Sequence, residues 1–289
     1  MDKVLIIGGS NIDYIGKSIA PVKGRDSNIG DINISFGGVG RNIAENLARL
    51  GSCVTFITSI GSDALGQEML KELKKININV IMPDGINKTS GYMAIHNNQG
   101  EMVLGLCSQE IGKYITLDYL KENEKLIDSF NYIFLDTNLE LDAIDYLTKR
   151  FNNKIIFLDV ISTTKGKKII DKIDYINYIK CNELEALSLF GENYFDKFDK
   201  NTLICTRGDK DVLYNIGKVI KSSKVDKVKD IKNVTGAGDA FFASFIYEIV
   251  KGKEVEKAVE AGKKAAALTL KVSEAVNKKL SVLAIEKEG

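Results

Sequence analysis

A short segment near the C-terminal end of the chain combines small residues with a carboxylate. Gly236, Ala237 and Gly238 lie where an apolar helix is expected to begin, and the free N–H groups of a helix start bind anions, helped by the helix dipole. Asp239 follows directly. A carboxylate would repel a bound phosphate, unless it faced an attacking hydroxyl group and took its proton. The alternative is a carboxylate that only stabilises the start of the helix.

A second glycine-rich segment lies near the N-terminus. Gly37 and Gly38 precede another predicted helix, and Asn42 lies in its first turn. Glycine lets a substrate approach the backbone closely, and an asparagine amide both donates and accepts hydrogen bonds. Asn11 and Asp13 follow the first predicted strand at alternate positions, so their side chains can point the same way. An acid and amides together suit the vicinal hydroxyls of a sugar, whereas the structural alternative is an Asx-rich turn.

The third segment, Asn182-Glu183-Leu184-Glu185, allows two interpretations. Asn182 can cap a helix, and Glu185 three residues later completes a capping-box pattern. Alternatively, the two side chains hold the water shell of a nucleotide-bound Mg²⁺, an ion that keeps several waters and needs few direct protein ligands.

Composition excludes several other kinds of chemistry. The 289 residues include one histidine, His96, so a multi-histidine metal site is impossible and a Ser-His-Asp or Cys-His catalyst would have to use His96. The four cysteines form no Cys-x-x-Cys pair, which favours small buried side chains in a reducing compartment. No P-loop is present, and no Gly-x-Gly-x-x-Gly follows the first strand, so a dinucleotide-dependent oxidoreductase is poorly supported.

Charge and hydropathy point to a small-molecule partner. The 40 basic and 39 acidic residues give a net charge of +1, which offers no long-range attraction for nucleic acid or an anionic membrane. The N-terminal apolar run is too short for a signal peptide, and no stretch approaches the roughly 20 apolar residues of a membrane span. We therefore expect a cytoplasmic protein without membrane or nucleic-acid partners.

The elements that must position these residues follow a β-α-β-α rhythm. Short apolar runs alternate with amphipathic stretches, which predicts an α/β fold with a mostly parallel sheet covered on both faces. Strands are expected at 4–7, 54–57, 132–135, 155–158, 175–179 and 203–205, and helices at 41–50, 64–74, 141–150 and 183–190. Half-exposed antiparallel strands at about 12–36 and 88–106, with a hairpin signal at Asn97-Asn98-Gln99-Gly100, predict a small sheet projecting from the body, such as a lid. No linker or repeat divides the chain, so residues 1–289 are expected to form a single domain.

Taken together, these segments resemble the ribokinase-like sugar and nucleoside kinases, also called the phosphofructokinase-B family. The resemblance covers essentially the whole chain, and its specificity lies in the order and spacing of the motifs. It implies a three-layer α/β/α fold with a β lid, and ATP and Mg²⁺ as cofactors. By the same resemblance, Asp239 is the catalytic base and Gly236, Ala237 and Gly238 form the anion hole. The family's nucleotide site maps onto Asn182, Thr206, Arg207, Gly208 and Thr235, with Glu185 reaching Mg²⁺ through water, and its sugar site onto Asn11, Asp13, Gly37, Gly38 and Asn42.

One position departs from the family pattern. Many members carry an aspartate six residues before the catalytic one, where it helps to form a monovalent-cation site, whereas this chain has Asn233. Activation by K⁺ is therefore doubtful.

Within the family, the pseudouridine kinases are the most similar group. The resemblance rests on Asp26-Ser27-Asn28, on the run from Gly37 to Gly51, and on Asp136-Thr137-Asn138-Leu139. It implies phosphorylation of the ribose 5′-hydroxyl of pseudouridine, whose base carries an extra ring N–H that Ser27, Asn28 or Asn138 could read; for the first two, a polar turn is the alternative. Other acceptors, namely ribose, another nucleoside or a fructose-type sugar, remain open, as does a non-catalytic nucleoside- or sugar-binding regulator. A homodimer through the exposed face of the lid is also expected.

Overall fold

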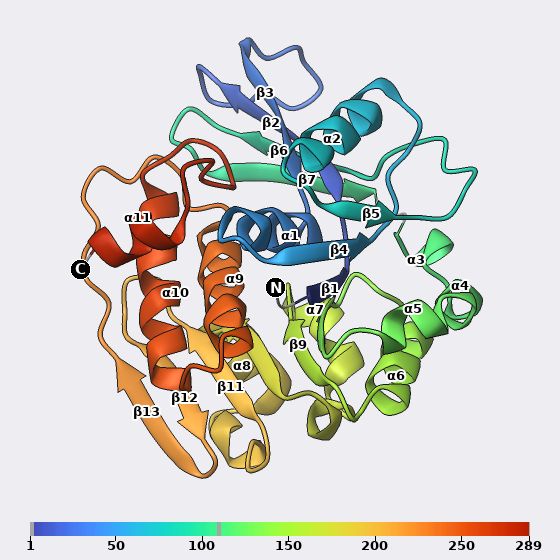
Figure 1. Cartoon of the computed structure of the whole chain (residues 1–289). Coiled ribbons are helices and arrows are strands. Elements are labelled where there is room, and N and C mark those ends of the chain that lie inside the picture. The colour runs from blue at the N-terminus through green and yellow to red at the C-terminus, as the bar shows by residue number, and fades with distance from the viewer. Residues whose placement is uncertain (1–2, 109–110, 289) are drawn as a thin grey trace.

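The larger of two sheets forms the centre of the molecule (Figure 1). The computed structural model describes residues 3–108 and 111–288, and within them nine strands pair in the order β13-β12-β11-β10-β9-β8-β1-β4-β5. Pairing is parallel from β5 to β11 and antiparallel for β12 and β13. The strands are β1 (Lys3–Ile7), β4 (Cys53–Ile57), β5 (Asn79–Ile81), β8 (Tyr132–Asp136), β9 (Ile155–Asp159), β10 (Tyr178–Asn182), β11 (Thr202–Thr206), β12 (Val212–Ile216) and β13 (Val219–Ser223).

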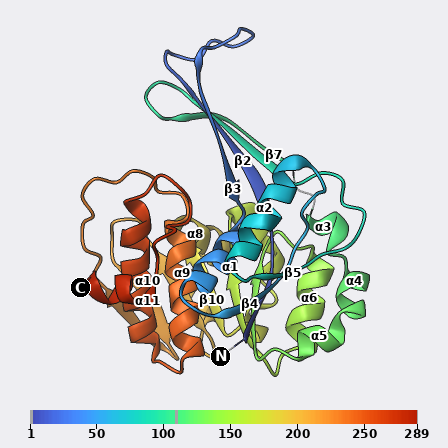
Figure 2. The ribbon, with the colours of Figure 1, turned by 45° about the horizontal axis from the view of Figure 1, so that its top comes forward.

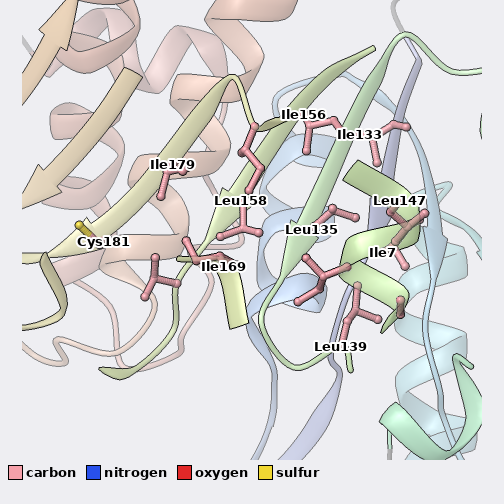
Figure 3. Close-up of a cluster of buried hydrophobic side chains, with 14 of the residues drawn as sticks. Ile7, Ile133, Leu135, Leu139, Leu147, Ile156, Leu158, Ile169, Ile179 and Cys181 are labelled. Carbon is pink, nitrogen blue, oxygen red and sulfur yellow. The ribbon is translucent and has the colours of Figure 1, made fainter. Parts of the chain in front are cut away.

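Both faces of this sheet are buried, because alternate residues of each strand enter different cores. Leu5 and Ile7 of β1 pack on one face with α3 (Ile111–Tyr114), α4 (Leu117–Glu122), α5 (Glu124–Asp128), α6 (Leu141–Arg150) and α8 (Glu183–Phe190). Figure 3 shows part of this core, in which Ile7, Leu135 and Leu158 are partners across three neighbouring strands. Val4 and Ile6 pack on the other face with α1 (Val39–Arg49), α2 (Ala64–Lys75), α9 (Ala237–Val250) and α10 (Val255–Leu270). The other α-helices of the described residues are α7 (Thr163–Gly166) and α11 (Val282–Lys287), and 3₁₀ helices cover Lys167–Ile169, Ile173–Tyr175 and Tyr194–Lys197. The predicted α/β architecture is confirmed.

The smaller sheet projects from the body, as predicted (Figure 2). Its strands pair in the order β3 (Gly30–Gly37), β2 (Asn11–Ser18), β6 (Gly91–His96) and β7 (Met102–Ser108). The two hairpins are antiparallel, but the central pair of β2 and β6 is parallel, which the sequence did not indicate. The two hairpins are far apart along the chain, so no local pattern encodes how they join. His96 ends β6, and its Nδ1 lies 3.0 Å from the carbonyl oxygen of Gly100 across the predicted hairpin.

The predicted elements of the body lie close to their expected positions. The four predicted helices correspond to α1, α2, α6 and α8. One strand is displaced: residues 173–175 form a 3₁₀ turn, and β10 covers Tyr178–Asn182 instead of 175–179. Among the described residues, no helix is long and apolar enough to cross a membrane.

Strand ends place several polar residues along one edge of the central sheet. Asp136, Asp159, Asn182 and Thr206 are the last residues of the neighbouring parallel strands β8, β9, β10 and β11. Their side chains therefore gather at the carboxyl edge, where open α/β sheets bind their ligands. The chain enters the lid from the same edge, because β2 follows β1 after three residues.

Candidate active site

Asp239 lies in the first turn of α9, a helix that is apolar on nearly all sides and buried against α1 and α10. Its side chain is buried, and the Nδ2 amide of Asn42 donates a hydrogen bond of 2.7 Å to its Oδ2 atom. These residues are 197 positions apart in the sequence. The fold thus brings together the two glycine-rich segments that the sequence singled out separately.

The start of α9 requires glycine at its N-cap. Gly236 adopts a left-handed conformation with φ of 81°, and a Cβ atom there would lie 1.8 Å from the carbonyl oxygen of Ala275. The following turn exposes the backbone N–H groups that a helix N-terminus leaves without helical partners. Asp239 therefore lies at a helix start of the kind that the sequence predicted for anion binding.

A buried ion pair lies against this helix start. The ammonium of Lys180 in β10 donates a hydrogen bond of 2.9 Å to Oδ2 of Asp159, and their side chains are 11% and 2% exposed. A Cβ atom added to Gly238 would lie 3.1 Å from the Lys180 ammonium. A positive charge therefore stands beside the amides of the helix start, and both can act on the same anion.

Charge and burial set the protonation of this cluster. Burial raises the pKa of Asp239 to about 6, the charges of Asp159 and Asp136 act in the same direction, and Lys180 and the bond from Asn42 oppose them. Burial alone would lower the pKa of Lys180, but the neighbouring carboxylates of Asp159 and Asp239 raise it above its ordinary value. Lys180 is therefore charged at neutral pH, and the pKa of Asp239 lies closer to neutrality than that of an ordinary aspartate.

The predicted sugar-binding residues meet where the lid joins the body. The amide of Asn11 donates a hydrogen bond to Oδ1 of Asp13, so these side chains lie together as expected. A Cβ atom on Gly37 would lie 2.1 Å from Oδ2 of Asp13, and one on Gly38, whose φ is 96°, would lie 2.5 Å from the carbonyl oxygen of Gly9. Burial raises the pKa of Asp13 to about 6, opposed by Asn11 and by the charge of Arg41. The glycines thus let a carboxylate and the backbone come close together at this point.

Asp136 binds backbone groups of three chain segments at the carboxyl edge, one of them the first turn of α1. Its Oδ2 accepts the backbone N–H groups of Gly9 at 2.8 Å and Gly40 at 3.1 Å, and its Oδ1 accepts that of Asn138 at 2.9 Å. Burial raises the pKa of Asp136 to about 6, against the effect of these hydrogen bonds. The Oδ1 atom of Asn138 accepts a bond of 2.6 Å from Lys165. Asn138 therefore lies at the carboxyl edge, in contact with the turn that leads into the lid.

Ser27 and Asn28 lie elsewhere in this chain. Both belong to the loop that joins β2 to β3 at the far end of the lid (Figure 2). The side chain of Asn28 accepts a bond from the N–H of Lys23 and donates to the carbonyl groups of Lys23 and Asp26. The polar turn that the sequence offered as an alternative is therefore present, and the other predicted sugar-binding residues are not brought to this loop.

Asn182 and Glu185 form the predicted capping box of α8. The side chain of each accepts the backbone N–H of the other at 2.8 Å. Burial raises the pKa of Glu185, while its bonds to Asn182 and the charge of Lys180 oppose this effect. Glu185 therefore caps the helix and also lies within the field of the Lys180 ion pair, so the two interpretations of this motif do not exclude each other.

The other residues expected at the nucleotide site lie after β11 and before α9. The hydroxyl of Thr206 donates to the carbonyl oxygen of Cys181, and Arg207 donates to that of Asp211. Gly208 has a φ of 66°. The N–H of Thr235 donates to the side chain of Asn233. Since β11 neighbours β10, Thr206 and Arg207 come at the end of the strand next to the one that carries Lys180.

The residues fit a magnesium ion that arrives with a nucleotide. Among residues 3–108 and 111–288, no cluster of three or more histidine, cysteine or acidic side chains could hold a metal by itself. Glu185 and Asp159 nevertheless supply hard oxygen atoms close to the anion site. Mg²⁺ is commonly held by substrate phosphates and water with one or two carboxylates, and this chain provides such carboxylates.

Lys180, Asp159 and Asp136 are central to this cluster, and the sequence motifs indicated only Asp136, without assigning it a role. A signal was present: Lys180 interrupts the apolar run of its strand, and both aspartates end apolar runs. Charges at such positions are either solvated or paired at the edge of the sheet, and only the order of the strands distinguishes the two cases.

The fold and this site define a class of protein. A doubly covered sheet with a lid, and a buried carboxylate at a helix N-terminus, form the arrangement of a phosphotransferase that acts on a hydroxyl group. The family model described as pfkB family carbohydrate kinase matches residues 1–281, and the chain belongs to this family. It is therefore a kinase with an alcohol group as acceptor.

Individual kinases are similar to this chain over nearly its whole length. The chain is 31% identical to a pseudouridine kinase of Escherichia coli over 97% of its length and 94% of the relative's. It is 27% identical to a guanosine-inosine kinase of Exiguobacterium acetylicum, over 92% of its length and 94% of the relative's. Among solved structures, a carbohydrate kinase from Agrobacterium tumefaciens matches with a TM-score of 0.85 and 29% identity, over 100% of this chain and 97% of the other.

Proposed function

We propose that the protein is an ATP-dependent kinase that phosphorylates the 5′-hydroxyl of pseudouridine. The observation that carries this proposal is the position of Asp239, buried at the start of α9 with Asn42 on one side and the Lys180 ion pair on the other. The likeness to a pseudouridine kinase over nearly the whole chain supports this particular nucleoside.

In the proposed reaction, Asp239 orients the hydroxyl and takes its proton. The bond from the hydroxyl oxygen to the γ-phosphorus forms while the bond from phosphorus to the β–γ bridging oxygen breaks, and ADP leaves. The N–H groups of Gly236, Ala237 and Gly238 and the ammonium of Lys180 stabilise the negative charge on the transferring group. Positioning and electrostatics supply most of the acceleration in such a reaction.

Substrate and nucleotide are proposed to bind on opposite sides of Asp239. Asn11, Asp13, Gly37, Gly38 and Asn42 would hold the ribose, and the lid would close to exclude water. The nucleotide would bind along Asn182, Thr206, Arg207, Gly208 and Thr235. When bound, Mg²⁺ would neutralise phosphate charge, with Glu185 and Asp159 orienting its waters. Since ATP is the proposed donor, we propose a cytoplasmic location, with which four free cysteines agree. Cys181 and Cys205 are buried as predicted, whereas Cys53 and Cys107 are exposed, so the prediction of buried side chains is wrong for these two.

Asn233 makes K⁺ activation doubtful in this scheme. Its amide donates to the carbonyl oxygen of Ser273 at 2.8 Å, and its oxygen accepts the N–H of Thr235 at 2.9 Å. A neutral side chain held in this way offers no charge to a monovalent cation. We expect similar rates in K⁺ and Na⁺ buffers.

The first experiment measures ADP release with a panel of acceptors: pseudouridine, uridine, guanosine, inosine, ribose and fructose. We expect pseudouridine to have the highest kcat/KM, by about tenfold or more over uridine, the discrimination typical of a polar contact to one added ring N–H. Higher turnover of ribose, another nucleoside or fructose would favour the alternative acceptor of the same family. Binding without turnover across the panel would favour a regulator.

The second experiment tests the catalytic base. Asp239→Asn keeps the size of the side chain but cannot accept the proton, so kcat should fall by about 10²-fold or more while nucleotide affinity stays within a few-fold. Turnover near that of the wild type would refute the assigned role.

We further propose a homodimer through the outer face of the lid. One row across its four strands is Ile34, Tyr14, Met93 and Leu106, and the first, third and fourth of these side chains are 53%, 43% and 66% exposed. Such a broad apolar face is typical of an interaction surface, and an isologous contact would cover it on both chains at once.

Sedimentation at micromolar concentration tests the dimer. We expect about twice the mass of one chain for the wild type, and a monomer for Ile34→Lys. The control is Val219→Lys, which alters an equally exposed apolar residue, 61% accessible, on β13. A monomeric wild type, or no effect of Ile34→Lys, would contradict the proposal.

A further inference from the structure

Arg41 lies beside the site, and the proposed reaction gives it no role. It occupies the first turn of α1 and is 7% exposed. Its NH2 group forms an ion pair with Glu45 one turn later, and Glu45 also pairs with Arg49. The guanidinium is thus anchored from within its own helix.

The other end of the guanidinium reaches out of the helix in two directions. Its NH1 group donates to the carbonyl oxygen of Phe36, near the end of lid strand β3, at 3.0 Å. The same group donates to Oδ1 of Asn42 at 3.1 Å. One nitrogen atom therefore joins the base of the lid to the amide that contacts Asp239.

The chemistry of these groups fixes the orientation of the amide. A guanidinium carries only donors, and an ionised carboxylate carries only acceptors. Between Arg41 and Asp239, the Asn42 amide satisfies both neighbours only with its oxygen toward Arg41 and its nitrogen toward Asp239. If the amide were turned by 180°, its N–H group would face the donors of Arg41 and its oxygen would face the acceptors of Asp239.

We propose that Arg41 is a positioning residue for phosphoryl transfer, which holds the Asn42 amide so that its N–H group faces and fixes the carboxylate of Asp239. The inference rests on the proposed role of Asp239 as the base. Because the bond from Arg41 to Phe36 shares the same nitrogen, the arrangement also ties the orientation of the base to the lid strand. Asn42 retains a second amide hydrogen, which can reach a substrate hydroxyl.

A pH profile distinguishes this role from simple structural support. The groups that act on Asp239 are Lys180, Asp159, Asp136 and Asn42, and the bond from Asn42 lowers the pKa of Asp239. Loss of a fixed amide orientation should therefore raise the pH at which Asp239 becomes ionised. The acid limb of kcat/KM should move upward by about one pH unit, the size expected for loss of one hydrogen bond to an ionised group.

The test compares Arg41→Met with the matched control Arg49→Met. Arg41 and Arg49 both lie on α1 and both pair with Glu45, so each variant removes one partner of Glu45. Of the two arginines, only Arg41 contacts Asn42. For Arg41→Met we expect kcat to fall by about 10- to 100-fold, less than loss of the base itself, with the KM for ATP within about threefold and the acid limb shifted. Arg49→Met should keep kcat within about twofold and an unshifted limb. Equal effects of the two variants would overturn the inference.

A double-mutant cycle provides the second measurement, and Arg41→Lys replaces Arg41→Met if the latter does not fold. If Arg41 acts through Asn42, adding the Arg41 substitution to Asn42→Ala should lower kcat by less than about twofold. Additive losses would refute the proposed route. The Asp239→Asn variant separates the two proposals: if it is inactive while Arg41→Met is normal, only the role of Arg41 fails.

Discussion

Alanine substitution of the two glycines at the start of α9 is expected to affect stability very differently. At Gly236, φ is 81°, and an added Cβ would lie 1.8 Å from the carbonyl oxygen of Ala275 and 2.6 Å from its carbonyl carbon. A left-handed conformation costs a non-glycine residue about 1–2 kcal/mol. The overlap is with backbone, so one of the two chain segments must also move. We expect Gly236→Ala to lower the free energy of unfolding by about 3 kcal/mol or more.

Gly238 differs because its neighbour is the end of a flexible side chain. An added Cβ would lie 3.1 Å from Nζ and 3.6 Å from Cε of Lys180, so a shift of the ammonium by a few tenths of an ångström relieves the contact. Alanine also gains up to about 1 kcal/mol over glycine inside a helix. We therefore expect Gly238→Ala to leave stability within about 1 kcal/mol of the wild type. Its kcat should fall, because the displaced ammonium and the added methyl group disturb the anion site.

Urea unfolding and kcat of the same variants test this reasoning. Gly252→Ala is the control, because Gly252 has a φ of 73° with nothing within 4 Å of an added Cβ. The free energy of unfolding of Gly252→Ala should fall only by the cost of the left-handed conformation, about 1–2 kcal/mol. For a chain of this size, the loss in Gly236→Ala corresponds to a fall in Tm of about 5 °C or more. If Gly236→Ala were no less stable than Gly252→Ala, or Gly238→Ala the least stable of the three, the reasoning would be refuted.

Two further predictions follow from the charges around Asp239. Because burial raises the pKa of Asp239 to about 6 and only the ionised form accepts a proton, kcat/KM should fall as pH decreases below about 6, by up to about tenfold per pH unit; a flat profile from pH 7 to pH 5 would contradict this. Lys180→Met removes the positive charge that lowers the pKa of Asp239, so the acid limb of the kcat/KM profile should move to higher pH by about one unit or more. The same change leaves Asp159 buried without its partner and should cost about 3–5 kcal/mol of stability. Adding Asp159→Asn should restore stability in urea unfolding, and an unshifted limb in the single variant would argue against the proximity of Lys180 to the base.

The spacing of apolar residues was sufficient to predict most helices and strands of the body, because the residues that face the core recur every few positions within each element. The alternation of Val4 and Ile6 with Leu5 and Ile7 predicted a strand covered on both sides, and both cores are observed. The boundary of β10 was harder to predict, because Tyr175 belongs to an apolar run that continues into the strand but lies in a 3₁₀ turn. A run of apolar residues indicates that a segment is buried, but it does not show where the turn ends and the strand begins.

The site was predictable only where its residues lie in local motifs. Asn42 and Asp239 each follow glycines at a helix start, and their contact follows from the packing of α1 on α9. Lys180 and Asp159 lie on neighbouring strands with 20 residues between them. Their pairing depends on the order of strands, which short sequence patterns do not contain.

The structure also bears on the two interpretations of Asp239. A carboxylate whose role is to stabilise a helix start is favoured as an anion by the dipole and by free N–H groups, and its pKa falls. The pKa of Asp239 is instead raised to about 6, because burial and the charges of Asp159 and Asp136 outweigh the groups that favour the anion. Ionised Asp239 therefore costs folding free energy at neutral pH, which is the reverse of a stabilising cap.

Asp63 provides the contrast within the same chain. At the N-cap of α2 it accepts the N–H groups of Gly66 and Thr89, and these bonds outweigh the effect of burial and lower its pKa. It therefore stabilises its helix as an anion. Two aspartates at helix starts thus differ in the sign of their pKa shift, and of the two only Asp239, which contacts Asn42, lowers the stability of the fold when it is ionised. This difference supports the proposed role of Asp239 as the acceptor of the proton from a substrate hydroxyl.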